Sequence, residues 1–135
     1  MSEETVENIR QAVEAFNRRD ADAFVALASP NVEWEDPIFW SGVARTYRGR
    51  EEVREWFNQI VEPWESIHVE VEEITEAADD RAFVGLFLTA RGKGSGVEAP
   101  GLRVWQVNWF ADGKTARRQV FRERAEALEA AGLSE

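Results

Sequence analysis

Residues 102–122 are LRVWQVNWFADGKTARRQVFR, two alternating segments joined by Asp112-Gly113. An Asp-Gly pair between two alternating runs is a strong signal of a tight β-hairpin. Residues 68–75 and 82–91 upstream also have the composition of strands, and Asp79-Asp80 between them predicts a turn. The second half of the chain therefore predicts successive antiparallel strands.

The first half of the chain has mostly helical spacing. Apolar residues recur at helical intervals from Val6 to Phe16, Asp20 begins a short second helix, and Pro63 ends a third helix. The predicted elements outside the hairpin region are helices from Ser2 to near Asn17, from Asp20 to before Pro30, from near Arg50 to before Pro63 and over 125–131, with a strand over 31–36. Early helices followed by hairpin strands indicate an α+β fold, and we expect one domain over residues 1–135.

The amino-acid composition disfavours several classes of binding partner and of reactive site. The chain has 135 residues, a formal net charge of −10, six tryptophans and no cysteine. The negative charge disfavours nucleic acid and anionic membranes, because both are bound through clustered Lys and Arg. Without cysteine there is no disulfide, thiolate nucleophile or thiolate metal site. The first residues lack the pattern of a secretion signal, so we expect a cytoplasmic protein.

Asp36 is the strongest catalytic candidate. Residues 32–37 alternate, so Asp36 should share the inward face of Val32 and Trp34. A carboxylate among apolar groups has a raised pKa and is a better proton acceptor at neutral pH. The alternative interpretation is an Asp that caps a turn before Pro37.

Four segments together resemble the NTF2-like superfamily, in particular its SnoaL-like and ketosteroid-isomerase-like branch. They are residues 16–20 (FNRRD), 32–37 (VEWEDP), 48–53 (RGREEV) and 110–114 (FADGK). The resemblance covers essentially the whole chain. It implies an NTF2-like (cystatin-like) cone, in which a curved mixed or antiparallel sheet wraps around the N-terminal helices and encloses one central pocket. It also implies that Asp36 lies at the pocket mouth, in the position of the isomerase general base.

The oxyanion donors that the resemblance implies are altered. The positions of the isomerase Tyr and protonated Asp fall at Ala12, which cannot donate, and at Gln106, which is a weaker acid. Steroid isomerisation is therefore not expected. The single histidine, His68, also argues against the dehydratase branch, which the resemblance associates with several active-site histidines.

The strand over 102–110 leaves two orientations open. In the first, which the resemblance favours, Gln106 and Asn108 face the pocket, and Trp105, Val107 and Trp109 form an outer stripe that predicts a homodimer through the outer sheet face. In the second, the tryptophans line the pocket and the amides lie on the surface.

Arg118, Val120 and Arg122 share one face of the last strand, which the resemblance places toward the cavity. Arg118 in that position would pair with Asp36, which weakens Asp36 as a base and suits binding a carboxylate or polarising a carbonyl. The alternative is that both arginines are rim residues. Trp34 and Trp56 are expected either to wall the pocket or to fill the core.

The predicted function is the binding of a small, largely apolar, carbonyl-containing ligand, with proton transfer of the isomerase or cyclase type and Asp36 as base. The alternative is a non-catalytic ligand-binding or dimeric assembly module. The predicted ligand-binding residues are Trp34, Trp56, Gln106, Asn108, Arg118, Val120 and Arg122. No metal or cofactor is expected.

Overall fold

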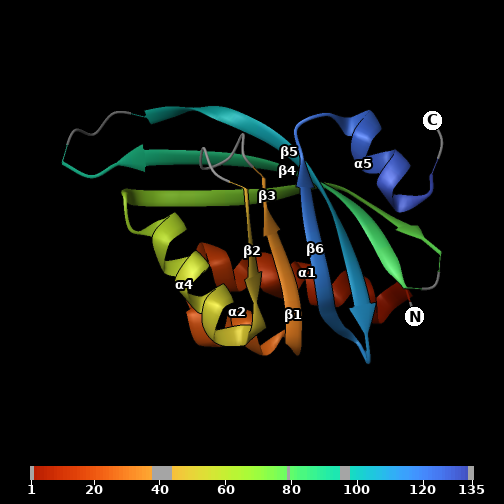
Figure 1. The fold of residues 1–135 in the computed structure, drawn as a ribbon. Coiled ribbons are helices and arrows are strands. Elements are labelled where there is room, and N and C mark those ends of the chain that lie inside the picture. Colours follow the sequence, from red (N-terminus) through yellow and green to blue (C-terminus); the bar gives the residue numbers. More distant parts are fainter. Residues whose placement is uncertain (1, 38–43, 79, 95–97, 134–135) are drawn as a thin grey trace.

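The structure is a computed structural model that describes residues 2–37, 44–78, 80–94 and 98–133. A curved six-stranded sheet has the order β2-β1-β6-β5-β4-β3 (Figure 1). The β1–β6 pair is parallel and the other neighbouring strands are antiparallel. The strands are β1 (Ala28–Asp36), β2 (Arg45–Arg48), β3 (Trp64–Ala77), β4 (Arg81–Gly92), β5 (Glu98–Ala111) and β6 (Lys114–Phe121).

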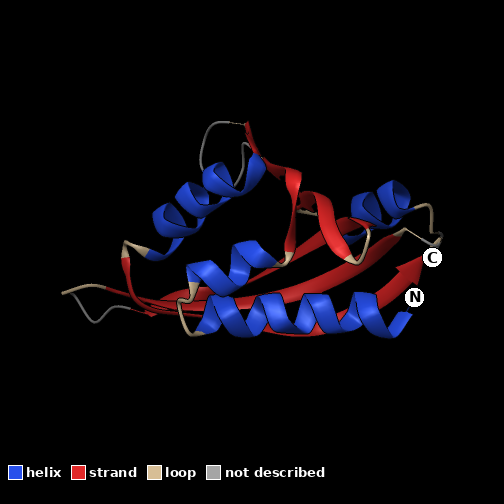
Figure 2. Cartoon of the chain, turned by 90° about the horizontal axis from the view of Figure 1, so that it is seen from below, coloured by secondary structure: helices blue, strands red, loops and turns tan. Residues whose placement is uncertain are grey.

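The helices lie on both faces of the sheet. They are α1 (Ser2–Asn17), α2 (Ala21–Ala26), α4 (Gly49–Val61) and α5 (Arg124–Ala131). Figure 1 shows α1, α2 and α4 on one side of the sheet and α5 on the other, and Figure 2 shows α1 running along the strands. The α+β fold with N-terminal helices against a curved mixed sheet is therefore confirmed. None of the helices in the described ranges is long and apolar enough to cross a membrane.

Several helices and strands begin or end at the residues that the sequence indicates. Asp112 and Gly113 both have positive φ values, 52° and 76°, as a two-residue hairpin turn requires, and they join β5 to β6. The side chain of Asp20 accepts a hydrogen bond from the Ala23 amide at 3.0 Å and so caps α2. Asn17 at the end of α1 exchanges two hydrogen bonds with the backbone of Val69, which fixes α1 to β3.

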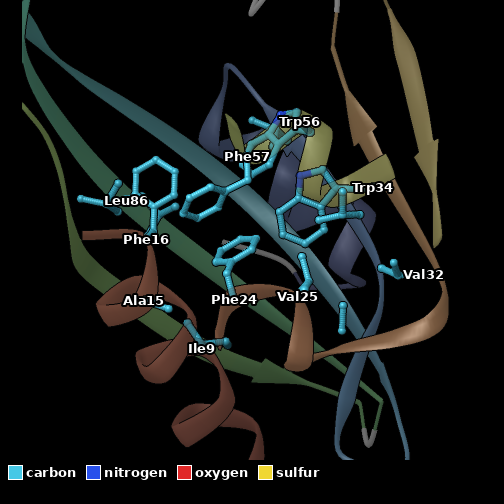
Figure 3. Packing of buried hydrophobic residues seen from close by; sticks show 14 of the residues in the cluster. Ile9, Ala15, Phe16, Phe24, Val25, Val32, Trp34, Trp56, Phe57 and Leu86 are labelled. Atoms are coloured by element: carbon cyan, nitrogen blue, oxygen red, sulfur yellow. The ribbon is translucent and has the colours of Figure 1, made fainter. Parts of the chain in front are cut away.

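The larger core lies between the inner face of the sheet and the three helices. Aromatic rings dominate it: Phe24 lies 5.0 Å from Phe57 and 5.5 Å from Trp34, measured between ring centroids. Figure 3 shows these rings and Trp56 gathered in one cluster. The rings come from α1, α2, β1 and α4, so the core holds each helix against the sheet.

A second, smaller core lies on the outer face, under α5. Val107 and Phe83 are fully buried there against Ala127, Leu128 and Ala131, and Trp105 and Trp109 pack around them. The outer stripe predicted for Trp105, Val107 and Trp109 therefore has the expected orientation, but α5 covers its centre. The two tryptophans remain half-buried.

Candidate functional site

A pocket of about 90 Å³ lies between the inner face of the sheet and helices α1, α2 and α4. By the measure of roughly 10–15 Å³ for one water, this is room for several waters or a small organic molecule. Most of its wall is apolar, and its polar lining residues are Gln106, Asn108, Thr115 and Arg118. The apolar lining residues are Ile9, Ala12, Val13, Phe16, Phe24, Leu27, Ala28, Trp34, Trp56, Ile60, Val69, Leu86, Leu88, Val104 and Val120.

Arg118 reaches the pocket because β6 lies in the middle of the sheet and points this residue inward. Arg118 is paired in register with Trp34 on β1 and with Asn108 on β5. Cross-strand partners on one face have neighbouring side chains, so the three residues form a row across three strands. We call Trp34, Arg118 and Asn108 the cross-strand row.

Arg118 is a buried cation, only 4% exposed. Its guanidinium carbon lies 4.1 Å from the ring centroid of Trp34 and 5.0 Å from that of Trp56, at distances that give cation–π attraction. Burial lowers the pKa of Arg118 to about 9, while the charges of Asp36 and Glu35 oppose this shift. The side chain therefore remains positively charged at neutral pH.

The hydrogen-bonding capacity of Arg118 is unused in the described part of the chain. Arg118 donates no hydrogen bond to a described residue, and its nearest carboxylate oxygen, Asp36 Oδ1, lies 4.0 Å from Nη2. Among the described residues, the buried side-chain nitrogen and oxygen atoms without a partner all belong to the cross-strand row: Trp34 Nε1, Asn108 Oδ1, Arg118 Nε and Arg118 Nη2. Such atoms are rare in folded proteins, because each costs about 1–3 kcal/mol.

Asp36 lies next to this row and is 5% exposed. The Trp56 indole donates a hydrogen bond to Asp36 Oδ1 at 3.3 Å. Val32, Trp34 and Asp36 are all buried, as the alternation predicts. However, Asp36 is not among the described residues that line the pocket, whereas its neighbours Trp56 and Arg118 are.

Six of the seven predicted ligand-binding residues line the pocket: Trp34, Trp56, Gln106, Asn108, Arg118 and Val120. Arg122 does not. It follows the last residue of β6, Phe121, and its side chain is exposed. Because the strand ends there, the alternation that placed Arg122 on the inward face no longer applies.

Two further positions concern the predicted chemistry. Ala12 lines the pocket and offers no hydrogen-bond donor from its side chain. His68 is a surface residue, with a side chain that is 56% exposed. Trp40, one of the six tryptophans of the chain, lies outside the described residues. Within the described ranges, no group of three or more His, Asp or Glu side chains is arranged to hold a metal ion.

Sequence reasoning did not assign Thr115 to the pocket. Its hydroxyl donates a hydrogen bond to Asn8 Oδ1 at 3.3 Å, and the Asn8 amide donates to the carbonyl oxygens of Leu27 and Gly113. Thr115 follows the Asp112-Gly113 turn closely, which suggests a surface position. It is nevertheless buried, because it contacts Asn8 of α1, pairs with Ala28 of β1 and donates its backbone N–H to Leu27 O at 3.1 Å.

The model of the SnoaL-like domain matches residues 9–118, and the chain therefore belongs to this family. No match was found among curated proteins. Many solved structures are similar, and they show the shared fold.

Three solved structures illustrate the likeness. An NTF2-like protein of unknown function from Burkholderia pseudomallei is 23% identical, with 93% of this chain and 95% of that chain covered and a TM-score of 0.76. A Mycobacterium tuberculosis protein in complex with estradiol-17β-hemisuccinate is 18% identical, with 89% and 94% covered and a TM-score of 0.76. A putative polyketide cyclase from Sinorhizobium meliloti is 19% identical, with 85% and 94% covered and a TM-score of 0.68.

Proposed function

We propose that this SnoaL-like protein binds one small, largely apolar molecule in the pocket, with a carbonyl oxygen of the ligand directed at Arg118. The observation that carries the proposal is a buried guanidinium that lines an otherwise mostly apolar pocket and donates no hydrogen bond to a described residue. Ligand pockets typically combine an apolar wall with a few well-placed polar groups, and this pocket has that composition.

The apolar residues that line the pocket favour a ligand that is largely apolar. Phe16, Phe24 and Trp56 present ring surfaces to the cavity, and Leu86 and Val104 supply aliphatic surface from the sheet. Burying apolar area here contributes about 25 cal/mol per Å². A ring or a branched alkyl group therefore suits this wall, while the oxygen accepts hydrogen bonds at the polar end.

A ketone and its hydrocarbon isostere test the contribution of Arg118. Acetophenone is expected to bind about tenfold or more tightly than α-methylstyrene, because a hydrogen bond to a charged group contributes about 1.5–3 kcal/mol. Arg118→Met should remove this preference. Dissociation constants would be measured by NMR titration of the indole N–H signals, two of which come from the pocket residues Trp34 and Trp56.

Arg117→Met is the matched control. Arg117 precedes Arg118 on β6 and faces the other side of the sheet, where its Nε donates to Glu35 at 2.9 Å. Its replacement should leave the preference for acetophenone unchanged. Equal binding of the ketone and the hydrocarbon by the unmodified protein would contradict the proposal.

A second candidate function is proton transfer of the isomerase or cyclase type, with Asp36 as the base. It is favoured by the closeness of the Asp36 carboxylate to the group that would polarise the carbonyl, at 4.0 Å from Arg118 Nη2. A positioned base typically contributes about 10²–10⁴-fold to a proton transfer. For this role the ligand must bring an acidic C–H within reach of Asp36.

Exchange of the methyl protons of acetophenone in D₂O tests this candidate. The protein should accelerate deuterium incorporation, followed by ¹H NMR, and Asp36→Asn should reduce the acceleration about 100-fold or more. Circular dichroism would verify that the variant is folded at the temperature used. A rate equal to that of the buffer alone would instead favour the alternative, a non-catalytic binding module or a dimer assembled through Trp105 and Trp109.

A further inference from the structure

We infer that the oxygen-bearing group of the ligand is a carboxylate, so that the pocket recognises a small organic acid with an apolar body. This inference rests on the proposed function, because it names the chemical class of the ligand in the same pocket. It is carried by the number, kind and position of the unpartnered polar atoms in the cross-strand row.

Donors outnumber acceptors in that row. Trp34 Nε1, Arg118 Nε and Arg118 Nη2 are three buried donor atoms without a partner, and Asn108 Oδ1 is one acceptor, among the described residues. A ketone offers two lone pairs on one oxygen, whereas a carboxylate offers about four lone-pair sites on two oxygens. A carboxylate therefore satisfies more of this row than a ketone.

Two other arginines of the chain show how it holds carboxylates. Arg103 donates through Nε and Nη2 to the two oxygens of Glu72, at 2.9 and 3.2 Å. Arg124 donates through the same pair of atoms to Glu73, at 3.2 and 2.7 Å. In Arg118 these same two nitrogens are fully buried and have no hydrogen-bond partner among the described residues. Planar, bidentate pairing with a carboxylate is the geometry for which a guanidinium is best suited.

Asp36 offsets only part of the charge of Arg118. The distance of 4.0 Å between Asp36 Oδ1 and Arg118 Nη2 is too long for a hydrogen bond, and the same oxygen accepts from Trp56. A ligand carboxylate in direct contact with the guanidinium can therefore accept hydrogen bonds that Arg118 does not donate to Asp36.

The remainder of the ligand is apolar. Phe16, Phe24 and Leu86 line the pocket beyond the cross-strand row, and Figure 3 shows Phe16, Leu86 and Phe24 grouped on one side of Trp34. A benzoate-like or branched aliphatic acid matches this division into one charged end and one apolar body. A carboxylate is a poor electrophile, so this ligand class favours a binding role over proton transfer next to a carbonyl.

Three ligands of similar shape test the inference: benzoate, acetophenone and α-methylstyrene. Benzoate is expected to bind the unmodified protein about tenfold more tightly than acetophenone at neutral pH, since its two oxygens can accept from both donor nitrogens of Arg118 in a bidentate ion pair, whereas the ketone offers one neutral oxygen. Titration calorimetry would give the affinities. The ¹⁵N signal of an arginine Nε–H, assigned by its loss in Arg118→Lys, should shift with benzoate and not with α-methylstyrene.

Variants separate the charge of Arg118 from its shape. Arg118→Lys keeps the charge without the planar pair of donors and should lose most of the advantage of benzoate over acetophenone. Arg118→Met should abolish it. Arg117→Met, whose guanidinium lies on the outer face, should retain it in full.

The outcomes distinguish this inference from the proposed function. If acetophenone binds more tightly than α-methylstyrene but benzoate binds no more tightly than acetophenone, the inference of a carboxylate ligand is wrong and the proposed function stands. If neither oxygen compound binds more tightly than the hydrocarbon, both are wrong. If the advantage of benzoate persists in Arg118→Met, another part of the protein holds the acid and the inference fails.

Discussion

Asp36→Asn is expected to lower the free energy of unfolding by about 3–5 kcal/mol, the usual cost of leaving one charge of a buried pair without its partner. Asparagine has nearly the same shape and can still accept the hydrogen bond from Trp56. The substitution therefore removes mainly the negative charge beside Arg118. Arg118 would then lose the larger of the two carboxylate effects that oppose its desolvation.

Urea denaturation of four proteins would measure this effect. Glu35→Gln is the matched control: Glu35 precedes Asp36 on β1 but pairs with Arg117 on the outer face, where its side chain is 30% exposed. Its replacement should cost no more than about 1 kcal/mol. The double variant Asp36→Asn/Arg118→Met should be more stable than Asp36→Asn alone, because the uncompensated charge is gone. A loss below 1 kcal/mol for Asp36→Asn would show that the two charges are not coupled.

The sequence predicts most of the fold because local signals agree with one another along the chain. Alternation from Val32 to Asp36, the Asp112-Gly113 turn and the helical spacing of Val53, Trp56 and Phe57 each indicate the element that is found. The orientation of β5 is also the one favoured by the resemblance, with Gln106 in the pocket. Patterns among residues that are close together in the sequence are sufficient to predict these elements.

The short strand β2 was not predicted. Residues 45–48 have only four positions and lie in a segment that reads as a loop between two glycines. Their strand conformation comes from pairing with β1, in which Tyr47 lies opposite Trp34. A strand of four residues is too short to show a recognisable alternation, so its pairing with β1 could not be predicted from the sequence.

The role of α5 was not predicted either. This helix is rich in alanine and has a small apolar face, in which only Leu128 is a large residue. The sequence therefore predicts a terminal helix without indicating what it covers. Its packing on Val107 changes the outer stripe from an exposed patch to a second core with two half-buried tryptophans at its edge.

The placement of Asp36 and Arg118 depends on how three strands align. Alternation alone indicates that each points inward, but the parallel pairing of β1 with β6 sets Arg118 beside Trp34 and at 4.0 Å from Asp36. The same register places Asn108 on the other side of Arg118. The candidate base of the sequence analysis is therefore found next to Arg118, which lines the pocket, while Asp36 is not among the described lining residues.

Phe57→Ala is expected to destabilise the fold by about 3–5 kcal/mol, which is the typical cost of truncating a buried phenylalanine. Phe57 is 1% exposed, and its ring lies 5.4 Å from Phe16 and 5.0 Å from Phe24. It does not line the pocket, but both of these neighbours do. Phe57 therefore supports the wall of the pocket from behind.

This loss is a large part of the 5–15 kcal/mol that stabilises a typical domain. Phe57→Leu, which leaves a smaller cavity, is expected to remain folded and to cost less than Phe57→Ala. Glu55→Ala, an exposed substitution on the same helix, should change the free energy of unfolding by no more than about 0.5 kcal/mol.

Ligand affinity gives a second measurement of the role of Phe57, in addition to stability. In folded Phe57→Leu, Phe16 and Phe24 can relax into the vacated space, so the affinity for α-methylstyrene should fall while the ratio of benzoate to acetophenone affinity is preserved. That ratio depends on Arg118, which Phe57 does not contact through any ring or hydrogen bond found in the described residues. A variant that changes the ratio and leaves the hydrocarbon affinity intact would show that the aromatic wall and the polar end of the pocket are not separable.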